Sequence, residues 1–208
     1  MSKITFAKVI SLGCFCSPAL WIKELGLRNC SYPLDWILTP DLRRTNDLIE
    51  NNFTDFLEKK YLIPGKRKSK FINYQNTKYK IGFIHDFSSH IAVEGQLIDV
   101  QTKYARRIER FYEAIYSGSI LFIRYVTRLD MDEAAEIDRF IDIVKKSNDN
   151  FKLILVKNSE STLGTIKNKD FILKIFDVEK DPGDIFRKEL PDELSVYLNQ
   201  HIEFVFTD

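Results

Sequence analysis

A cysteine stands where a strand-like run of this chain gives way to a helix-like one. The run 8–12 ends two residues before Cys14, and Cys16 is followed by Ser17 and Pro18, which begin an amphipathic stretch. Ser17 is a favourable N-cap and Pro18 suits the first helical position, so we expect Cys16 just before the free N–H groups and positive end of a helix. Both effects favour the thiolate over the thiol. The pattern therefore predicts a nucleophilic cysteine.

A cysteine nucleophile needs a nearby base, and that base needs an orienting partner. His85 follows an apolar strand-like piece and is the predicted general base. Asp86 and the more distant Asp35 are the candidate orienting carboxylates. Neighbours on an extended chain point in opposite directions, so Asp86 is not the automatic choice and both stay open. A structural histidine packed in the core is the alternative interpretation of His85.

Three further residues are expected to bind the ligand. Arg124 ends an apolar run and is expensive to bury unpaired, so it either clamps a carboxylate or phosphate or pairs with Asp86 or Asp130. Trp36 is a large side chain that directly follows Asp35 in an irregular segment. The backbone N–H of Ser17 is expected to help stabilise an oxyanion.

The remaining cysteines predict no metal or redox centre. Cys14 is expected to pack into the core, and the Cys-x-Cys spacing lacks the longer spacer of zinc sites. Neither a Walker pattern nor a dinucleotide fingerprint follows the first strand. We therefore expect no metal and no cofactor.

Strand-like and helix-like segments alternate along the chain. Strands are predicted near 4–12, 71–74, 79–84, 120–123, 151–156, 171–178 and 201–206, and helices near 18–26, 41–49, 53–60, 100–116, 130–146 and 191–200. A cap from Thr39 is expected for the second helix, and a basic turn over 64–70. The alternation predicts a single three-layer α/β domain over 1–208, with a mostly parallel sheet and helices on both faces. Ligands bind at the carboxyl ends of such strands, where Cys16, His85 and Arg124 are all expected.

Composition limits the possible partners and location. The chain has 208 residues, 44% of them hydrophobic, with 31 basic and 30 acidic side chains and a net charge of +1. This balance predicts a globular protein without a nucleic-acid or membrane partner. The N-terminus lacks an apolar signal segment, no apolar run approaches about 20 residues, and an odd number of cysteines fits a reducing compartment. We therefore expect a cytoplasmic protein.

At these residues the chain resembles the bacterial family described as "putative papain-like cysteine peptidase", a domain of otherwise unknown function. The matching motifs are Ser11-Leu12-Gly13-x-x-Cys16-x-x-Ala19, Ser31-Tyr32-Pro33-Leu34-Asp35-Trp36, Phe83-x-His85-Asp86-Phe87, Arg106-Arg107-x-x-Arg110-Phe111 and Leu121-Phe122-Ile123-Arg124. The resemblance covers roughly residues 8–160 and implies Cys16 as nucleophile, His85 as general base and Asp86 or Asp35 as orienter. The chain departs from true papain-like enzymes in lacking a Cys-Gly-Ser-Cys-Trp segment and in its α/β alternation.

Two hypotheses of function follow. The first is a cysteine-dependent hydrolase or acyl transferase that acts on a peptide or small-molecule substrate through Cys16 and His85. The alternative is a transferase-like or binding domain for a phosphorylated or sugar-nucleotide ligand. In that case Arg124, Arg106 and the basic loop hold phosphate, and Cys16 only packs. A non-catalytic interaction module is the third possibility.

Overall fold

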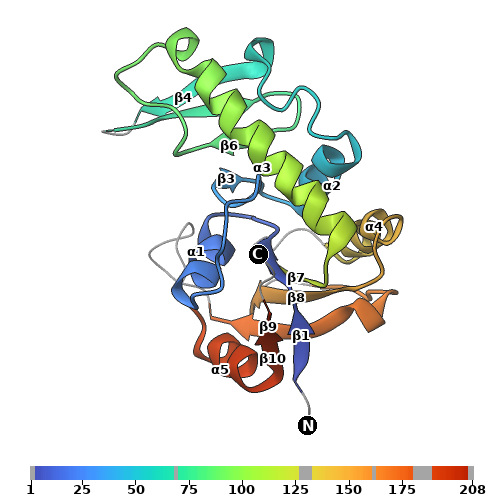
Figure 1. The fold of residues 1–208 in the computed structure, drawn as a ribbon. Helices are drawn as coiled ribbons and strands as arrows, with labels where there is room; N and C mark the ends of the chain where they lie inside the picture. Colours follow the sequence, from blue (N-terminus) through green and yellow to red (C-terminus); the bar gives the residue numbers. More distant parts are fainter. Residues whose placement is uncertain (1–2, 68–69, 127–132, 161–162, 180–188, 206–208) are drawn as a thin grey trace.

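The computed structural model describes residues 3–67, 70–126, 133–160, 163–179 and 189–205 (Figure 1). Its α-helices are α1 (Ser17–Glu24), α2 (Leu42–Glu50), α3 (Leu97–Ser117), α4 (Ala134–Lys145) and α5 (Asp192–His201). Its strands are β1 (Ile4–Phe6), β2 (Lys8–Ser11), β3 (Ile37–Leu38), β4 (Leu62–Arg67), β5 (Ile72–Asn76), β6 (Ile81–Phe83), β7 (Ile120–Val126), β8 (Phe151–Asn158), β9 (Ile172–Val178) and β10 (Ile202–Phe204). Short 3₁₀ turns lie at Lys59–Tyr61, Val93–Gly95 and Lys169–Phe171.

A four-stranded parallel sheet in the order β2-β7-β8-β9 forms the centre of the fold. β7 pairs with β2 on one side and with β8 on the other, and all seven residues of β7 are buried. This burial explains the continuous apolar run of its sequence, as expected for a central parallel strand. The β7–α4–β8 unit confirms the predicted strand–helix–strand crossover.

Successive side chains of the parallel strands enter two separate apolar layers. On one face Phe122 meets Phe140 of α4 with ring centroids 5.1 Å apart, and α3 packs in the same cluster. On the other face Tyr125 meets Trp21 of α1 at 5.4 Å, and α5 completes that cluster. Helices therefore cover both faces of the sheet, which confirms the predicted three-layer α/β architecture (Figure 1).

A second, antiparallel sheet in the order β3-β6-β5-β4 was not anticipated. Figure 1 shows it at the opposite end of the molecule from α5, with the long helix α3 running from it toward the parallel sheet. The ring centroids of Tyr104 of α3 and Phe83 of β6 are 5.8 Å apart. Phe111, on the same face of the helix, belongs to the same core. α3 thus joins the two sheets. Among the described residues, no helix combines the length and apolar character needed to cross a bilayer.

Several predicted boundaries are corrected by backbone geometry. The predicted strand 4–12 is split into β1 and β2, and β1 pairs in parallel with β10 rather than joining the main sheet. Phe206, the predicted end of the last strand, lies outside the described residues. The predicted helix over 53–60 is a series of turns, because Phe53 and Asp55 have φ values of 55° and 62°, which a right-handed helix does not allow.

Two further predictions fail for reasons of hydrogen bonding. Asp41 caps α2, since its side chain accepts from the backbone N–H of Arg44 at 3.1 Å, whereas the predicted cap Thr39 binds the backbone of Cys14. The basic stretch 64–70 is not a simple turn, because residues 62–67 form the strand β4 against β5.

Candidate active site

The turn between β2 and α1 depends on two residues with left-handed backbone. Gly13 and Cys14 have φ values of 72° and 75°. A side chain at Gly13 would place its Cβ 2.7 Å from Oγ1 of Thr39, so glycine is required there. The N–H of Cys14 donates to that same Oγ1 at 3.3 Å, and the N–H of Thr39 donates to the carbonyl of Cys14 at 3.0 Å. The Cys14 side chain is fully buried in the core. The turn therefore fixes the position of Cys16 at the start of the following helix.

Cys16 is the N-cap of α1, one residue earlier than the sequence predicts. Its φ and ψ of −70° and −13° are already helical, and its carbonyl accepts from the N–H of Leu20 at 2.9 Å. Ser17, predicted as the cap, instead occupies the first helical position and is fully buried, and Pro18 follows it. The shift arises because Cys14 takes the non-helical conformation, which lets the helix start sooner. The thiol consequently lies at the helix terminus itself.

The electrostatic environment of Cys16 opposes the thiolate. Burial raises the pKa of its thiol to about 11, and the negative charges of Asp86 and Asp35 add to that increase. The hydrogen bond from its own backbone N–H lowers the pKa, but does not overcome burial. The predicted thiolate is therefore corrected: at neutral pH Cys16 rests as a thiol. The sequence argument failed because it considered the helix alone and not the two carboxylates.

Asp35 is one of those carboxylates and is itself held in a buried turn. Its Oδ2 accepts from Nη2 of Arg28 at 2.8 Å and from the backbone N–H of Tyr32 at 2.9 Å. Burial raises the pKa of Asp35 to about 6, although the charges of Arg28 and Arg107 and the Tyr32 N–H lower it. The guanidinium of Arg28 also lies 4.8 Å above the ring of Trp36. The predicted ligand residue Trp36 is thus packed against the cation that holds Asp35.

Asp86 is the second carboxylate and is held by α3. Nζ of Lys103 lies 2.5 Å from Oδ1 of Asp86, and the hydroxyl of Tyr104 donates to Oδ2 at 2.9 Å. The Asp86 side chain is only 4% exposed. The bend that follows β6 therefore brings a fixed negative charge into the surroundings of Cys16.

His85 lies in the same bend but on its exposed side. Its ring packs edge-on against Phe71, with centroids 5.9 Å apart. This exposure excludes the alternative of a histidine packed in the core. The structure brings Asp35 and Asp86 into the electrostatic environment of Cys16, whereas the imidazole faces outward in the adjacent position. β6 belongs to the antiparallel sheet, so the expectation that His85 and Cys16 follow strands of one parallel sheet is wrong.

Arg124, predicted to clamp a ligand, is instead bound inside the protein. It lies within β7 rather than after it and is fully buried. Its Nη2 and Nε donate to Glu133 at 2.9 and 3.4 Å, and its Nη1 donates to the carbonyl of Leu12 at 3.0 Å. The alternative of an internal ion pair is therefore the right one. The partner is Glu133 and not Asp86, which α3 holds; Asp130, the other predicted partner, lies outside the described residues.

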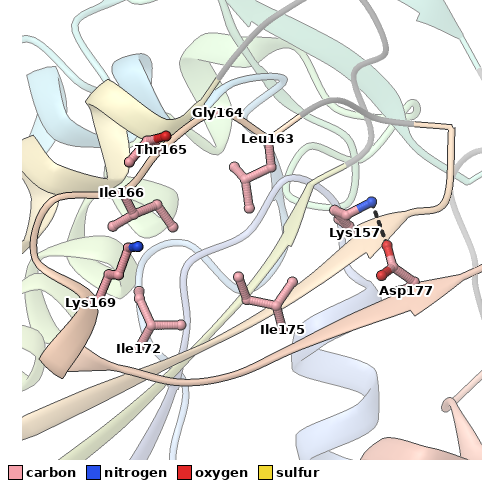
Figure 2. A pocket seen from close by; sticks show the side chains of 9 residues that line it. All are labelled: Lys157, Leu163, Gly164, Thr165, Ile166, Lys169, Ile172, Ile175 and Asp177. Carbon is pink, nitrogen blue, oxygen red and sulfur yellow. Dashed lines mark ion pairs between the residues drawn. The ribbon is translucent and has the colours of Figure 1, made fainter.

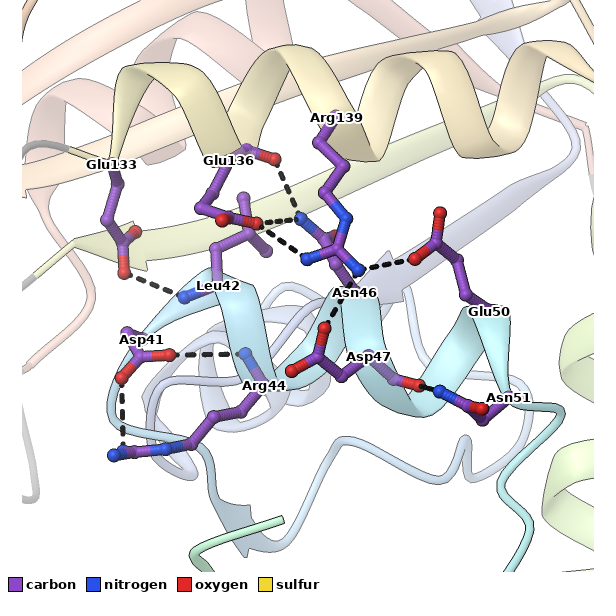
Figure 3. A network of polar contacts seen from close by, with 10 residues as sticks. All are labelled: Asp41, Leu42, Arg44, Asn46, Asp47, Glu50, Asn51, Glu133, Glu136 and Arg139. Atoms are coloured by element: carbon purple, nitrogen blue, oxygen red, sulfur yellow. Dashed lines mark hydrogen bonds and ion pairs between the residues drawn. The ribbon is translucent and has the colours of Figure 1, made fainter.

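Glu133 extends this pair to a second helix. Its Oε1 also accepts from the backbone N–H of Leu42, at the start of α2, at 2.9 Å (Figure 3). Further along the same two helices, Arg139 bridges α4 to Asp47 and Glu50 of α2. The polar network positions α2 and α4, and it engages the guanidinium of Arg124 where that side chain is fully buried.

Some residues of this region were not singled out by the sequence as parts of a site. Tyr104 has the helical spacing of apolar positions, and that spacing gives no sign that its hydroxyl holds Asp86. Arg107, next to it on the helix, lies 4.9 Å from the Tyr104 ring centroid. The arginine-rich helix motif was the available signal. In the described part of the chain, no three His, Cys, Asp or Glu side chains group to hold a metal ion.

A cavity of about 640 Å³ lies away from these residues (Figure 2). It is bounded by β8, β9 and the segment 163–169, and its lining is largely apolar, with the Lys157–Asp177 ion pair at one end. None of the sequence-predicted site residues lines it. Cys16 and its carboxylates therefore form a separate candidate site.

A buried cysteine at a strand–helix junction, under the electrostatic influence of two held carboxylates, places this chain among α/β proteins with a candidate cysteine site. The profile of the family described as "Putative papain-like cysteine peptidase" matches residues 7–161, and the chain belongs to that family. The matched segment contains Cys16, Asp35, His85, Asp86 and the whole β7–α4–β8 unit.

One curated relative also matches. It is "Uncharacterized protein R408" of Acanthamoeba polyphaga mimivirus, which is 30% identical over 201 residues, covering 84% of this chain and 90% of the relative. The expected bacterial character of the family is not supported by this viral relative. No solved structure matches the chain.

The Arg124–Glu133 pair predicts an asymmetric cost of mutation. Glu133→Ala leaves a buried guanidinium uncompensated and should lower the free energy of unfolding by about 3–5 kcal/mol in urea denaturation. Glu136→Ala, on the same helix but pairing with a partly exposed Arg139, should cost at most about 1 kcal/mol. Equal losses in the two variants would contradict a dominant buried pair.

The raised pKa of Cys16 predicts how its alkylation rate depends on pH. With a pKa of about 11, the rate of Cys16 alkylation by iodoacetamide should keep rising between pH 8 and 10, measured by peptide mass spectrometry. Asp86→Asn removes a negative charge that disfavours the thiolate, so it should shift this profile to lower pH. Asp99→Asn, on the first turn of α3, is the matched control and should leave the profile unchanged. A profile that levels off below pH 9 in the wild type would contradict the raised pKa.

Proposed function

We propose that this protein is a cysteine-dependent acyl hydrolase of the peptidase type, with Cys16 as the nucleophile. The observation that carries the proposal is the position of Cys16 at the N-cap of α1, where its thiol feels the charge of two carboxylates that Arg28, Lys103 and Tyr104 hold in place. Family membership supports the same reaction class, since the family is described as peptidase-like. The substrate class that fits is a peptide or another small acyl compound.

In the proposed reaction, the Cys16 sulfur attacks the carbonyl carbon of the substrate while its proton moves to a base. The carbonyl oxygen becomes an oxyanion, which the N–H groups of Ser17 and Ala19 at the positive end of α1 stabilise. Collapse of this intermediate breaks the acyl bond, and the leaving group takes a proton from the protonated base. Water then hydrolyses the thioester and regenerates the thiol.

The raised pKa of Cys16 makes the base essential to this mechanism. A thiol with a pKa of about 11 is almost entirely protonated at pH 7, so attack requires proton removal in the same step. His85 is our proposed base, because imidazole titrates near neutral pH and the ring lies in the bend that also carries Asp86. Catalytic hydrogen bonds often shorten only when substrate is bound, so the outward ring in the free protein is compatible with this role.

The carboxylates take different parts in the proposal. Asp86 and Asp35 act on the thiol with negative charge, which stabilises an imidazolium formed beside it. Asp35 is held by Arg28 and the Tyr32 N–H, and Asp86 by Lys103 and the Tyr104 hydroxyl, so neither needs to move during the reaction. The alternative function, a phosphate-binding domain that depends on Arg124, loses its main residue because that side chain is paired internally.

The proposal is tested by the pH dependence of two variants on a p-nitrophenyl ester and on a peptide mixture. Cys16→Ala should abolish hydrolysis at every pH. His85→Gln should lower kcat/KM by about 10²–10⁴-fold at pH 7, and this defect should shrink as pH approaches 11, where the thiolate forms without a base.

His90→Gln changes an exposed histidine of the following loop and serves as the matched control, with wild-type kinetics expected. Hydrolysis that survives in Cys16→Ala would refute the nucleophile. A His85→Gln defect that stays constant with pH would refute the base.

A further inference from the structure

The carboxylates near Cys16 are paired within the protein, whereas two arginines of α3 are not paired with any described carboxylate. Two carboxylates, Asp35 and Asp86, lie in its electrostatic environment. Each is matched by one cation, because Arg28 lies 2.8 Å from Asp35 and Lys103 lies 2.5 Å from Asp86. Each carboxylate of the site therefore already has a cationic partner.

Two further guanidinium groups reach the same region from α3. The charge of Arg107 acts on Asp35 and on Tyr104, and that of Arg110 acts on Tyr32, which adjoins Asp35 in the buried turn. No carboxylate of the described residues forms an ion pair with either arginine. Arg107 and Arg110 are therefore cations near the Asp35 turn without a paired carboxylate in the described part of the chain, and such cations favour an anionic ligand.

Arg107 is the more unusual of the two arginines. Its guanidinium lies 4.9 Å from the ring centroid of Tyr104, whose hydroxyl binds Asp86, so the group is fixed against the site. Its Nη1 is buried and has no hydrogen-bond acceptor. Arg110, by contrast, donates its Nη1 to the carbonyl of Ser31, although at 3.4 Å. A buried charged donor without an acceptor is costly, and such groups in folded proteins call for a specific explanation.

We propose that Arg107 binds an anionic oxygen group, a carboxylate or a phosphate, on the acyl substrate that Cys16 attacks. The inference rests on the proposed function, since it places this anion on the substrate of the same site. The planar guanidinium presents paired N–H donors that match either group, and stacking on Tyr104 limits its rotation. An acyl compound with an anion near the scissile carbonyl would supply the acceptor that Nη1 of Arg107 lacks.

The test compares an anionic and a neutral reagent with the same reactive carbon. Iodoacetate and iodoacetamide both alkylate cysteine: the S–C bond forms, the C–I bond breaks, iodide leaves and the thiol proton passes to the buffer. The ratio of their rates at Cys16, read by peptide mass spectrometry, should exceed the ratio in the urea-unfolded chain. Arg107→Gln should lower the ratio about tenfold, the order expected for one charged hydrogen bond.

Two further variants make the result specific. Arg106→Gln removes an exposed cation from the neighbouring position of α3 and should leave the ratio unchanged. Arg107→Lys keeps the charge without the planar fork and should retain part of the preference, so it tests the proposal if Arg107→Gln does not fold. A wild-type ratio equal to that of the unfolded chain, or an equal fall in Arg106→Gln, would overturn the inference.

Failure of the nucleophile is distinguishable from failure of the anion site. If Cys16 reacts with neither reagent, the proposed function fails, and anion binding is then read from the melting temperature in inorganic phosphate and in succinate. A rise that is lost in Arg107→Gln and kept in Arg106→Gln supports the anion site, and the more effective salt identifies the group. No rise in the wild type, or equal rises in both variants, overturns it.

Discussion

The buried pair of Arg124 and Glu133 is the interaction on which the arrangement of the site depends. A guanidinium without exposure must have its donors satisfied inside the protein, and here they bind the carbonyl of Leu12, just after β2, and the carboxylate of Glu133, the residue that precedes α4. The same carboxylate accepts from the first N–H of α2. One ion pair therefore fixes where β2 ends relative to two helices. The turn through Gly13 and Cys14 starts from that fixed point.

A second constraint comes from α3, which extends from the antiparallel sheet to the parallel one. Its Lys103 and Tyr104 hold Asp86 at one side of the candidate site, while Arg110 reaches the carbonyl of Ser31 at the other. The thiol is thus enclosed by segments that only the tertiary fold brings together. Burial, together with the charge of their carboxylates, keeps Cys16 protonated at rest, so in the proposed mechanism reactivity depends on proton transfer and not on a preformed thiolate.

The sequence predicted the elements whose pattern is local and missed those set by distant partners. The apolar run of β7 and the spacing of α4 were sufficient for the parallel centre of the fold, because a strand buried on both faces leaves a clear signature. The antiparallel sheet was missed because its strands are short and its aromatic residues pack against α3. The cap of α2 was misassigned by two residues, since Thr39 and Asp41 are both suitable and only the turn at Cys14 decides between them.

For the site, residue identity was a better guide than residue environment. Cys16, Asp35 and Asp86 were selected from the sequence, and their electrostatic proximity could not be derived from it. The direction of the Cys16 pKa was wrong because a helix terminus is a local feature, whereas burial and carboxylate charge are not. Arg124 was misread for the same reason: Glu133 lay within a predicted helix, and its role as an internal partner emerges only from the packing of α4 on α2.

The most direct measurement of the central claim is the capture of an acyl group on the protein. After a brief incubation with p-nitrophenyl acetate and acid quenching, peptide mass spectrometry should find one acetyl group on Cys16, bound as a thioester that hydroxylamine removes. An adduct confined to Cys30 or to lysines, with hydrolysis continuing at the same rate, would contradict the account of Cys16 as the nucleophile.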